Sequence, residues 1–126
     1  MEMVREQGMK AIAAASPERW FTKEFRERAP ATVARICALV EATPAEGYLG
    51  CCGAIRNNHQ HDSLGRIVAP TLVIAGASDP ATPPAAGRAV AERIKGTKYV
   101  ELPAAHLSNI EQPERFTAEV LGFLRG

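Results

Sequence analysis

Two chemically capable side chains, an acid and a histidine, each follow a short aliphatic run. Asp79 lies on a proline-rich turn after the run 71–75, and His106 lies just after the run 99–102. Open sheets with parallel strands place ligands and catalytic groups beyond the carboxyl ends of those strands. A carboxylate there can fix the tautomer of a histidine and stabilise the imidazolium that forms when the histidine accepts a proton. The sequence therefore predicts one acid–base site shared by Asp79 and His106.

Each residue also has a structural interpretation. Asp-Pro is a common turn dipeptide, so Asp79 could simply shape its loop. His106 could be a satisfied polar residue beside a strand end. The pairing favours the catalytic interpretation, because the carboxyl ends of adjacent parallel strands lie on one edge of a sheet.

A nucleophile for this pair is not evident. The Gly-x-Ser-x-Gly elbow, which would precede the acid, does not occur in the 126 residues. Ser78 directly precedes the acid, so the two side chains would not converge on one histidine, and Ser108 follows the histidine without an elbow. Cys51 or Cys52 would give the order Cys, Asp, His, and a thiolate can act as a nucleophile. No aliphatic strand precedes them, so we favour free thiols packed as small residues in a helix.

A second group of polar residues has side chains of the types that bind metal ions. His59, His61 and Asp62 are close in sequence, but no further ligand follows at a metal-site spacing. We predict a solvated loop here. Three cysteines, two of them adjacent, do not form a disulfide framework, so reduced thiols are expected.

The elements that must position the acid and the histidine belong to the second half of the chain. Strands are predicted at 71–75 and 99–102, and helices at 85–94 and 113–124, which is a right-handed strand–helix–strand unit followed by a helix. Two parallel strands are too few for an independent sheet. We therefore expect this half to be the edge of a larger sheet.

The first half is predicted to be helical. Residues 1–15 form a weakly amphipathic helix, and Ser16 is expected to cap a helix that begins at Pro17. Residues 31–42 repeat apolar side chains at helical spacing, which predicts one buried face. Residues 45–57 are rich in glycine and other small residues, where another element could approach closely.

Composition narrows the function classes. The 126 residues carry a net charge of +1 and 46% hydrophobic residues, as expected for one globular domain with a modest core. No basic cluster indicates nucleic acid, and no apolar run could span a membrane. Charged residues interrupt the first 15 positions, which excludes the apolar core of a signal peptide. A cytoplasmic protein is expected.

The two signatures around the acid and the histidine resemble those of α/β-hydrolases. Asp-Pro-Ala-Thr-Pro-Pro at 79–84 and Ala-Ala-His-Leu-Ser-Asn-Ile-Glu-Gln-Pro at 104–113 are similar to segments of the 3-oxoadipate enol-lactonases. Arg-Trp-Phe-Thr-x-x-Phe at 19–25 and the stretch 47–56 resemble the helical cap of that family. The resemblance covers nearly the whole chain. The stretch 57–61 departs from it, since a shorter and more acidic connection would be expected there.

The resemblance implies an α/β class and a partial α/β-hydrolase fold. Residues 1–57 would be a helical cap region, and residues 58–126 would hold the last two parallel strands with their helices. The family hydrolyses an enol-lactone to 3-oxoadipate in the β-ketoadipate pathway, through an acyl-enzyme and without a cofactor. Asp79 would orient His106, which would activate a Ser outside this chain, while Arg19 and Trp20 would line the site of a small carboxylated lactone.

Expected partners follow from the incomplete sheet. The N-terminal half of the hydrolase, from the same gene or as a separate chain, or self-association would cover the exposed strand edge. The 126 residues alone would then be inactive. Two alternatives stay open: another α/β-hydrolase esterase, or a non-catalytic interaction module that recruits a partner through the edge around Leu72 and Val73.

Overall fold

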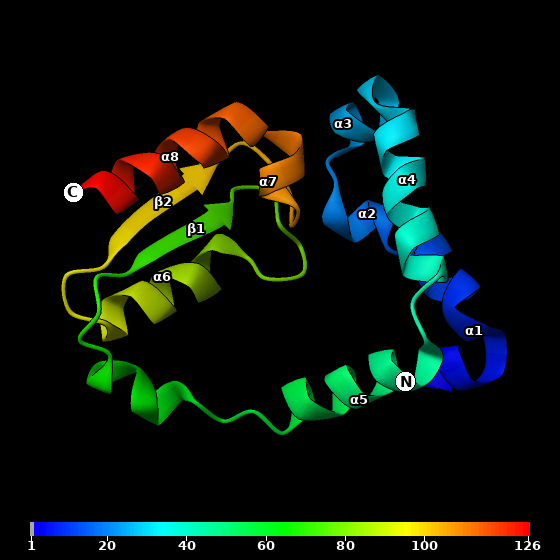
Figure 1. Ribbon diagram of the computed structural model, residues 1–126, viewed down its shortest axis with the longest axis horizontal. Helices are drawn as coiled ribbons and strands as arrows, with labels where there is room; N and C mark the ends of the chain where they lie inside the picture. Colours follow the sequence, from blue (N-terminus) through cyan, green and yellow to red (C-terminus); the bar gives the residue numbers. More distant parts are fainter. Residues whose placement is uncertain (1) are drawn as a thin grey trace. The chain divides into compact units, whose positions relative to one another are not determined.

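The computed structural model describes residues 2–126, and the predicted helix position Met1 lies outside them. The chain divides into two compact units (Figure 1). One comprises the residues up to Glu18 together with Lys23–His59, and the other comprises Arg19–Thr22 together with Gln60–Gly126. The boundary predicted between residues 57 and 58 for a cap and a core stays a prediction. The small segment Arg19–Thr22 nevertheless groups with the second unit.

The first unit is helical, as predicted. Its helices are α1 (Glu2–Ala15), α3 (Lys23–Arg28), α4 (Pro30–Glu41) and α5 (Ala45–Arg56), and the short α2 (Pro17–Trp20) follows α1 in the chain. Helix α1 packs against α4 and α5. It is not one continuous helix, because Gly8 adopts φ 72° and ψ −175° and kinks it. Glycine reaches this conformation without the steric cost that a Cβ would add.

Ser16 does not act as the predicted cap of α2. Its hydroxyl donates a hydrogen bond of 2.7 Å to the carbonyl of Ile12. Its backbone N–H donates to the same carbonyl at 3.0 Å. Ser16 therefore completes the end of α1, because the last carbonyls of a helix need donors from outside the regular ladder.

Helices α4 and α5 are less buried than their sequences predict. The apolar stripe of α4 is only half-buried, and neither helix has a fully buried residue. Within the described residues, nothing lies within 4 Å of the position that a Cβ would take at Gly47, Gly50 or Gly53. Helix α1 packs against α5, but within the described part of the first unit no element makes the close approach at these three glycines that their small size would allow. Cys51 is exposed rather than packed, and Cys52 is half-buried.

The second unit contains a parallel two-stranded sheet with flanking helices, as predicted. Strand β1 (Leu72–Gly76) pairs with β2 (Lys98–Leu102), and the register sets Gly76 opposite Leu102. Helix α6 (Pro84–Arg93) packs on the strands, and α8 (Pro113–Arg125) lies on the other side of the sheet (Figure 1). Two short elements were not predicted: the 3₁₀ helix η1 (His61–Arg66) and α7 (Ser108–Glu111).

Strand β1 is more exposed than a strand covered on both faces. Residues 72–74 are half-buried, and only the last two residues of β1 are buried. The reason is that β1 has one neighbouring strand among the described residues. The core lies at the carboxyl ends of the strands, where Leu102, Ala104, Ala105 and Phe21 are almost fully buried. Phe21 thereby anchors the segment Arg19–Thr22 in this unit.

Within residues 2–126, none of the helices combines the length and the apolarity that crossing a bilayer requires.

Candidate functional site

The two strands end at the same level, which brings their following loops together. Hydrogen bonds join these loops directly: Ala77 N–H donates to the carbonyl of Leu102 at 2.8 Å, and Ser78 N–H donates to the carbonyl of Ala104 at 3.0 Å. The loop with the acid and the loop with the histidine are therefore fixed to each other by backbone bonds, as expected for the carboxyl edge of a parallel sheet.

Gly76 permits the close approach of these loops. A Cβ at this position would collide with the carbonyl oxygen of Ala105 and would lie 2.7 Å from that of Ala104. Neither atom belongs to a flexible side chain, so any larger residue must displace backbone. The last residue of β1 thus sets how closely the histidine loop crosses the acid loop.

The carboxylate of Asp79 is held by hydrogen bonds from the turn that follows it. One carboxylate oxygen, Oδ1, accepts from Ala81 N–H at 2.8 Å and from Thr82 N–H at 3.0 Å. The other oxygen, Oδ2, accepts from the Thr82 hydroxyl at 2.7 Å. This is the Asx-turn geometry that an aspartate adopts with the backbone two and three residues later. Asp79 is 6% exposed, so its orientation is fixed by these bonds.

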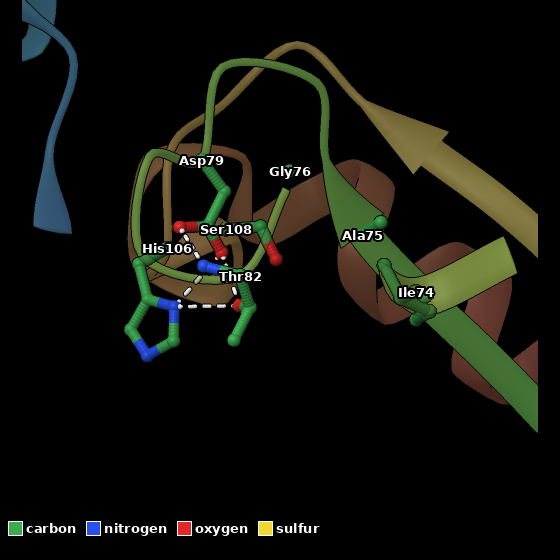
Figure 2. Close-up of a pocket in the computed structure, with 8 residues that line it drawn as sticks. Ile74, Ala75, Gly76, Asp79, Thr82, His106 and Ser108 are labelled. Atoms are coloured by element: carbon green, nitrogen blue, oxygen red, sulfur yellow. Dashed lines mark hydrogen bonds and ion pairs between the residues drawn. The ribbon is translucent and has the colours of Figure 1, made fainter. Parts of the chain in front are cut away.

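His106 completes the pair that the sequence predicts. Its Nδ1 lies 2.8 Å from Asp79 Oδ2 and 3.2 Å from Thr82 Oγ1. An ionised carboxylate can only accept, so Nδ1 carries a proton, and in the neutral form of the ring the lone pair is on Nε2. Figure 2 shows Nε2 on the far side of the ring from Asp79 and Thr82. The imidazole therefore presents a base away from its carboxylate partner.

The pKa of Asp79 lies below its ordinary value of 3.8. Burial on its own raises the pKa by penalising the charged form. The hydrogen bonds from Thr82, His106 and Ala81 outweigh this effect, because each stabilises the carboxylate. Asp79 is consequently ionised at neutral pH, as the orientation of His106 requires.

The pair borders a cavity of about 180 Å³. Its lining comes from the end of β1, the two loops, α6 and the start of α7: Ile74, Ala75, Gly76, Asp79, Thr82, Gly87, His106 and Ser108. An oriented imidazole beside a cavity can take a proton from a hydroxyl or a water molecule and later return it. The arrangement is therefore suited to general acid–base chemistry.

Arg19 and Trp20, predicted to line a substrate site, are not among the residues lining this cavity. Arg19 is exposed and Trp20 is half-buried. Their segment is nevertheless near the histidine, because the carbonyl of Trp20 accepts from Leu107 N–H at 3.0 Å. Their predicted role in substrate binding stays a prediction.

Two residues of the site were missed at the sequence level. Thr82 has a detectable signal, since a hydroxyl three residues after an aspartate on a turn suits an Asx turn. Glu111 has none, because two of its three bonds come from Thr22, which is 89 residues away: the Thr22 N–H donates to the carboxylate at 3.0 Å and the Thr22 hydroxyl at 2.7 Å. The third bond, from Ala105 N–H at 3.0 Å, is local.

The remaining candidates do not join the pair. The hydrogen bonds of His106 go to Asp79 and Thr82 and to neither Ser78 nor Ser108, although Ser108 borders the same cavity. His59, His61 and Asp62 are exposed, and His61 and Asp62 lie in η1 rather than in a loop. Across residues 2–126, no three His, Cys, Asp or Glu side chains are grouped so as to hold a metal ion.

The chain is similar to known proteins with the alpha/beta hydrolase fold. Residues 6–113 match the family model described as alpha/beta hydrolase fold. The chain is 41% identical over 119 residues to 3-oxoadipate enol-lactonase 2 of Acinetobacter baylyi, covering 94% of this chain and 45% of the relative, its C-terminal part. The chain thus spans about half the length of the curated relatives it matches.

Solved structures of an enol-lactonase and an esterase have the same fold as this chain. The enol-lactonase from Burkholderia xenovorans LB400 superposes with a TM-score of 0.97 at 42% identity, covering 99% of this chain and 48% of that one. A thermophilic esterase from Thermogutta terrifontis superposes with a TM-score of 0.90 at 31% identity, covering 98% and 46%. The predicted fold class and the predicted resemblance are confirmed.

Proposed function

Because the chain belongs to the alpha/beta hydrolase family, whose matching members include enol-lactonases and esterases, we propose that it supplies the acid and the histidine of a Ser–His–Asp triad. The reaction is hydrolysis of a carboxylic ester or lactone. The serine comes from residues that precede this stretch in the complete enzyme. The observation that carries the proposal is the 2.8 Å bond from His106 Nδ1 to Asp79 Oδ2 beyond the ends of two parallel strands.

The steps follow from the orientation of His106. Nε2 takes the proton of the serine hydroxyl while the serine oxygen attacks the carbonyl carbon. The carbon–oxygen bond to the leaving group breaks, and the imidazolium returns the proton to the leaving oxygen. Nε2 then takes a proton from water, the water oxygen attacks the acyl carbon, and the serine oxygen leaves and is reprotonated. Asp79 stays ionised throughout and stabilises the imidazolium in both halves.

The substrate that we propose is 3-oxoadipate enol-lactone, and the product is 3-oxoadipate. Support comes from the similarity to two relatives with the name 3-oxoadipate enol-lactonase, at 41% and 33% identity. The substrate has a free carboxylate, which suits a cationic side chain such as the exposed Arg19, with Trp20 offering apolar surface. Esterase activity on simple esters is the second candidate, supported by the 31% identity to the esterase structure.

The partner that we propose is the N-terminal half of the hydrolase, in the same polypeptide or as a separate chain. Strand β1 has a single neighbouring strand among the described residues, and its residues 72–74 are half-buried. A parallel strand on its free edge would cover these apolar side chains and satisfy the unpaired backbone groups.

The decisive experiment compares three proteins: residues 1–126 alone, the same residues joined behind the N-terminal part of the Acinetobacter baylyi enol-lactonase, and that hybrid with His106→Ala. Hydrolysis of the enol-lactone and of p-nitrophenyl acetate is measured for each. We expect the hybrid to hydrolyse the lactone faster than the acetate, and the other two to be inactive. Turnover by residues 1–126 alone, or by the His106→Ala hybrid, would refute the proposal.

The cysteines supply a control for the nucleophile. The hybrid with Cys52→Ser should keep nearly all of its activity, because Cys52 lies in α5 and is not proposed to react. A large loss in this variant would instead support a cysteine nucleophile. A hybrid that folds but hydrolyses neither substrate would favour the non-catalytic interaction module.

A further inference from the structure

We propose that Glu111 is a positioning residue: it holds the backbone next to His106 against the segment Arg19–Thr22 and so keeps the imidazole aligned with Asp79. The inference rests on the proposed catalytic role of His106. It adds to that proposal a link between the histidine and the segment of the predicted substrate residues Arg19 and Trp20.

Glu111 accepts three hydrogen bonds on its carboxylate. Its carboxylate is 5% exposed, and Oε1 accepts two backbone N–H groups, from Thr22 and from Ala105, each at 3.0 Å. Oε2 accepts the Thr22 hydroxyl at 2.7 Å. One side chain at the end of α7 therefore joins residue 22 to the residue that directly precedes His106.

A second bond fixes the other side of the histidine. Leu107 N–H, which directly follows His106, donates to the carbonyl of Trp20 at 3.0 Å. His106 is thus held on both sides by bonds that involve the segment Arg19–Thr22. The ring itself bonds only to Asp79 and Thr82 among the described residues, so its position depends on the backbone that carries it.

The hydrogen bonds of Glu111 hold the histidine loop firmly, because breaking them would leave a buried charge without donors. A buried carboxylate is strongly disfavoured unless hydrogen bonds replace the water that it has lost. If the histidine loop moved away, Glu111 would lose the bond from Ala105, and its buried carboxylate would keep only the two bonds from Thr22. A glutamate at this position therefore resists displacement of the loop more than a neutral side chain would, since charged acceptors form the stronger hydrogen bonds.

Alignment of the imidazole is sensitive to small movements. A displacement of about 1 Å in a catalytic group can lower a rate by about a hundredfold. We therefore expect changes at Glu111 or Thr22 to lower kcat more than they raise KM, although neither residue borders the cavity beside His106.

The test uses the natural polypeptide that carries these residues, with Glu111→Gln, Thr22→Val and Thr22→Ser. Two properties are followed by NMR: the low-field Nδ1 proton of His106 and the titration of the Asp79 carboxyl carbon. Glu111→Gln removes the charge, and Thr22→Val removes the hydroxyl that donates to Glu111 while keeping the backbone N–H that also donates to it. Both substitutions should shift the Nδ1 proton upfield and raise the titration midpoint of Asp79, whereas Thr22→Ser keeps the hydroxyl and should leave both signals unchanged. Where hydrolysis is measurable, kcat should fall about ten- to a hundredfold in Glu111→Gln and should stay close to that of the unchanged protein in Thr22→Ser, which keeps the hydroxyl.

Matched controls separate position from stability. Glu119→Gln breaks a surface ion pair with Lys98, and Thr43→Val removes an exposed hydroxyl bond to Leu39, so both should leave the two NMR signals unchanged. Folded Glu111→Gln and Thr22→Val proteins with unchanged signals would overturn the inference. Unfolding of both would overturn it as well, because Glu111 would then be needed for the fold rather than for the position of His106. Absence of hydrolysis in the unchanged protein would refute the proposed function alone, because the NMR signals do not depend on turnover.

Discussion

At the residue scale, Asp79 and Thr82 act together. Thr82 supplies both a backbone N–H and a hydroxyl to the carboxylate, and the same hydroxyl lies 3.2 Å from His106 Nδ1. A hydroxyl that donates to Asp79 can still accept from Nδ1–H. The acid, the threonine and the imidazole therefore form a closed set of three groups, in which Thr82 favours both the charge on Asp79 and the tautomer of His106.

Thr82→Val should raise the pKa of Asp79. The substitution keeps the shape and the backbone N–H but removes the side-chain hydrogen bond that lowers this pKa. Titration of the Asp79 carboxyl carbon by NMR measures the effect. Thr97→Val is the matched control, because the Thr97 hydroxyl donates to the carbonyl of Ile94 and does not contact the acid. An unchanged midpoint in Thr82→Val would show that the backbone bonds alone hold the carboxylate in its charged form.

The same pKa predicts how stability depends on pH. Because the pKa of Asp79 is lower in the folded state than the ordinary value of 3.8, its ionisation stabilises the fold above that value. This contribution is lost as the pH falls below 3.8 and through the depressed pKa. In Asp79→Asn the corresponding part of the acid-induced loss should be missing, which urea unfolding at a series of pH values between about 2 and 5 would measure. Asp62→Asn in η1 is the control, and an equal loss in both variants would contradict the prediction.

Asp79→Asn should also abolish most of the proposed hydrolysis. An asparagine amide in place of the carboxylate cannot favour the Nδ1–H tautomer in the same way, and in serine triads such a change lowers kcat by about 10⁴-fold. Steady-state kinetics on the hybrid enzyme measures the loss. A decrease below tenfold would mean that Asp79 only shapes its loop.

Among the helices and strands, β1 sets the geometry of the site, because its last residue limits how closely the histidine loop approaches the acid loop. Gly76→Ala should push the histidine loop away, because the new Cβ meets the backbone carbonyls of Ala104 and Ala105. Overpacking of this kind costs about 1–3 kcal/mol of the free energy of unfolding. Urea unfolding measures that loss, and the Nδ1 proton of His106 reports the separation from Asp79.

Gly122→Ala is the control for that substitution. Gly122 lies in α8, nothing among the described residues is within 4 Å of its Cβ position, and alanine favours a helix by about 1 kcal/mol over glycine. It should therefore stabilise the protein slightly and leave His106 unchanged. Equal stability of the Gly76→Ala and Gly122→Ala proteins would contradict the role given to Gly76.

Local sequence patterns were sufficient for the regular elements of the site. The aliphatic runs predicted β1 and β2 to within a residue at each end, and the shared strand edge predicted the meeting of Asp79 with His106. What was missed depends on tertiary contacts. The bond from Thr22 to Glu111 joins residues 89 positions apart, and no local pattern encodes it. The apolar stripe of α4 is half-buried and not fully buried as predicted, because helical spacing identifies the apolar face of a helix but not what covers that face.

At the scale of the whole molecule, uncovered apolar surface in both units is the outstanding feature. Residues 72–74 of β1 are half-buried, and α4 and α5 have no fully buried residue. Leu39 and Ile55 on these helices are 60% and 72% exposed. Family members that match this chain are about twice its length. Both the sheet edge and the helical faces are therefore suited to contact with the N-terminal hydrolase half that we propose as the partner.

Residues 1–126 expressed alone should accordingly associate with one another. A parallel pair of strands is too small to be stable alone, and the free edge of β1 offers unpaired backbone groups to another chain. Sedimentation velocity should show species larger than 13.5 kDa that increase with concentration. The hybrid with the N-terminal half should instead sediment as a discrete species independent of concentration, because its added strand covers β1. A monomeric 126-residue chain with one cooperative unfolding transition would contradict this prediction, since it would show that the two units are sufficient for their own stability.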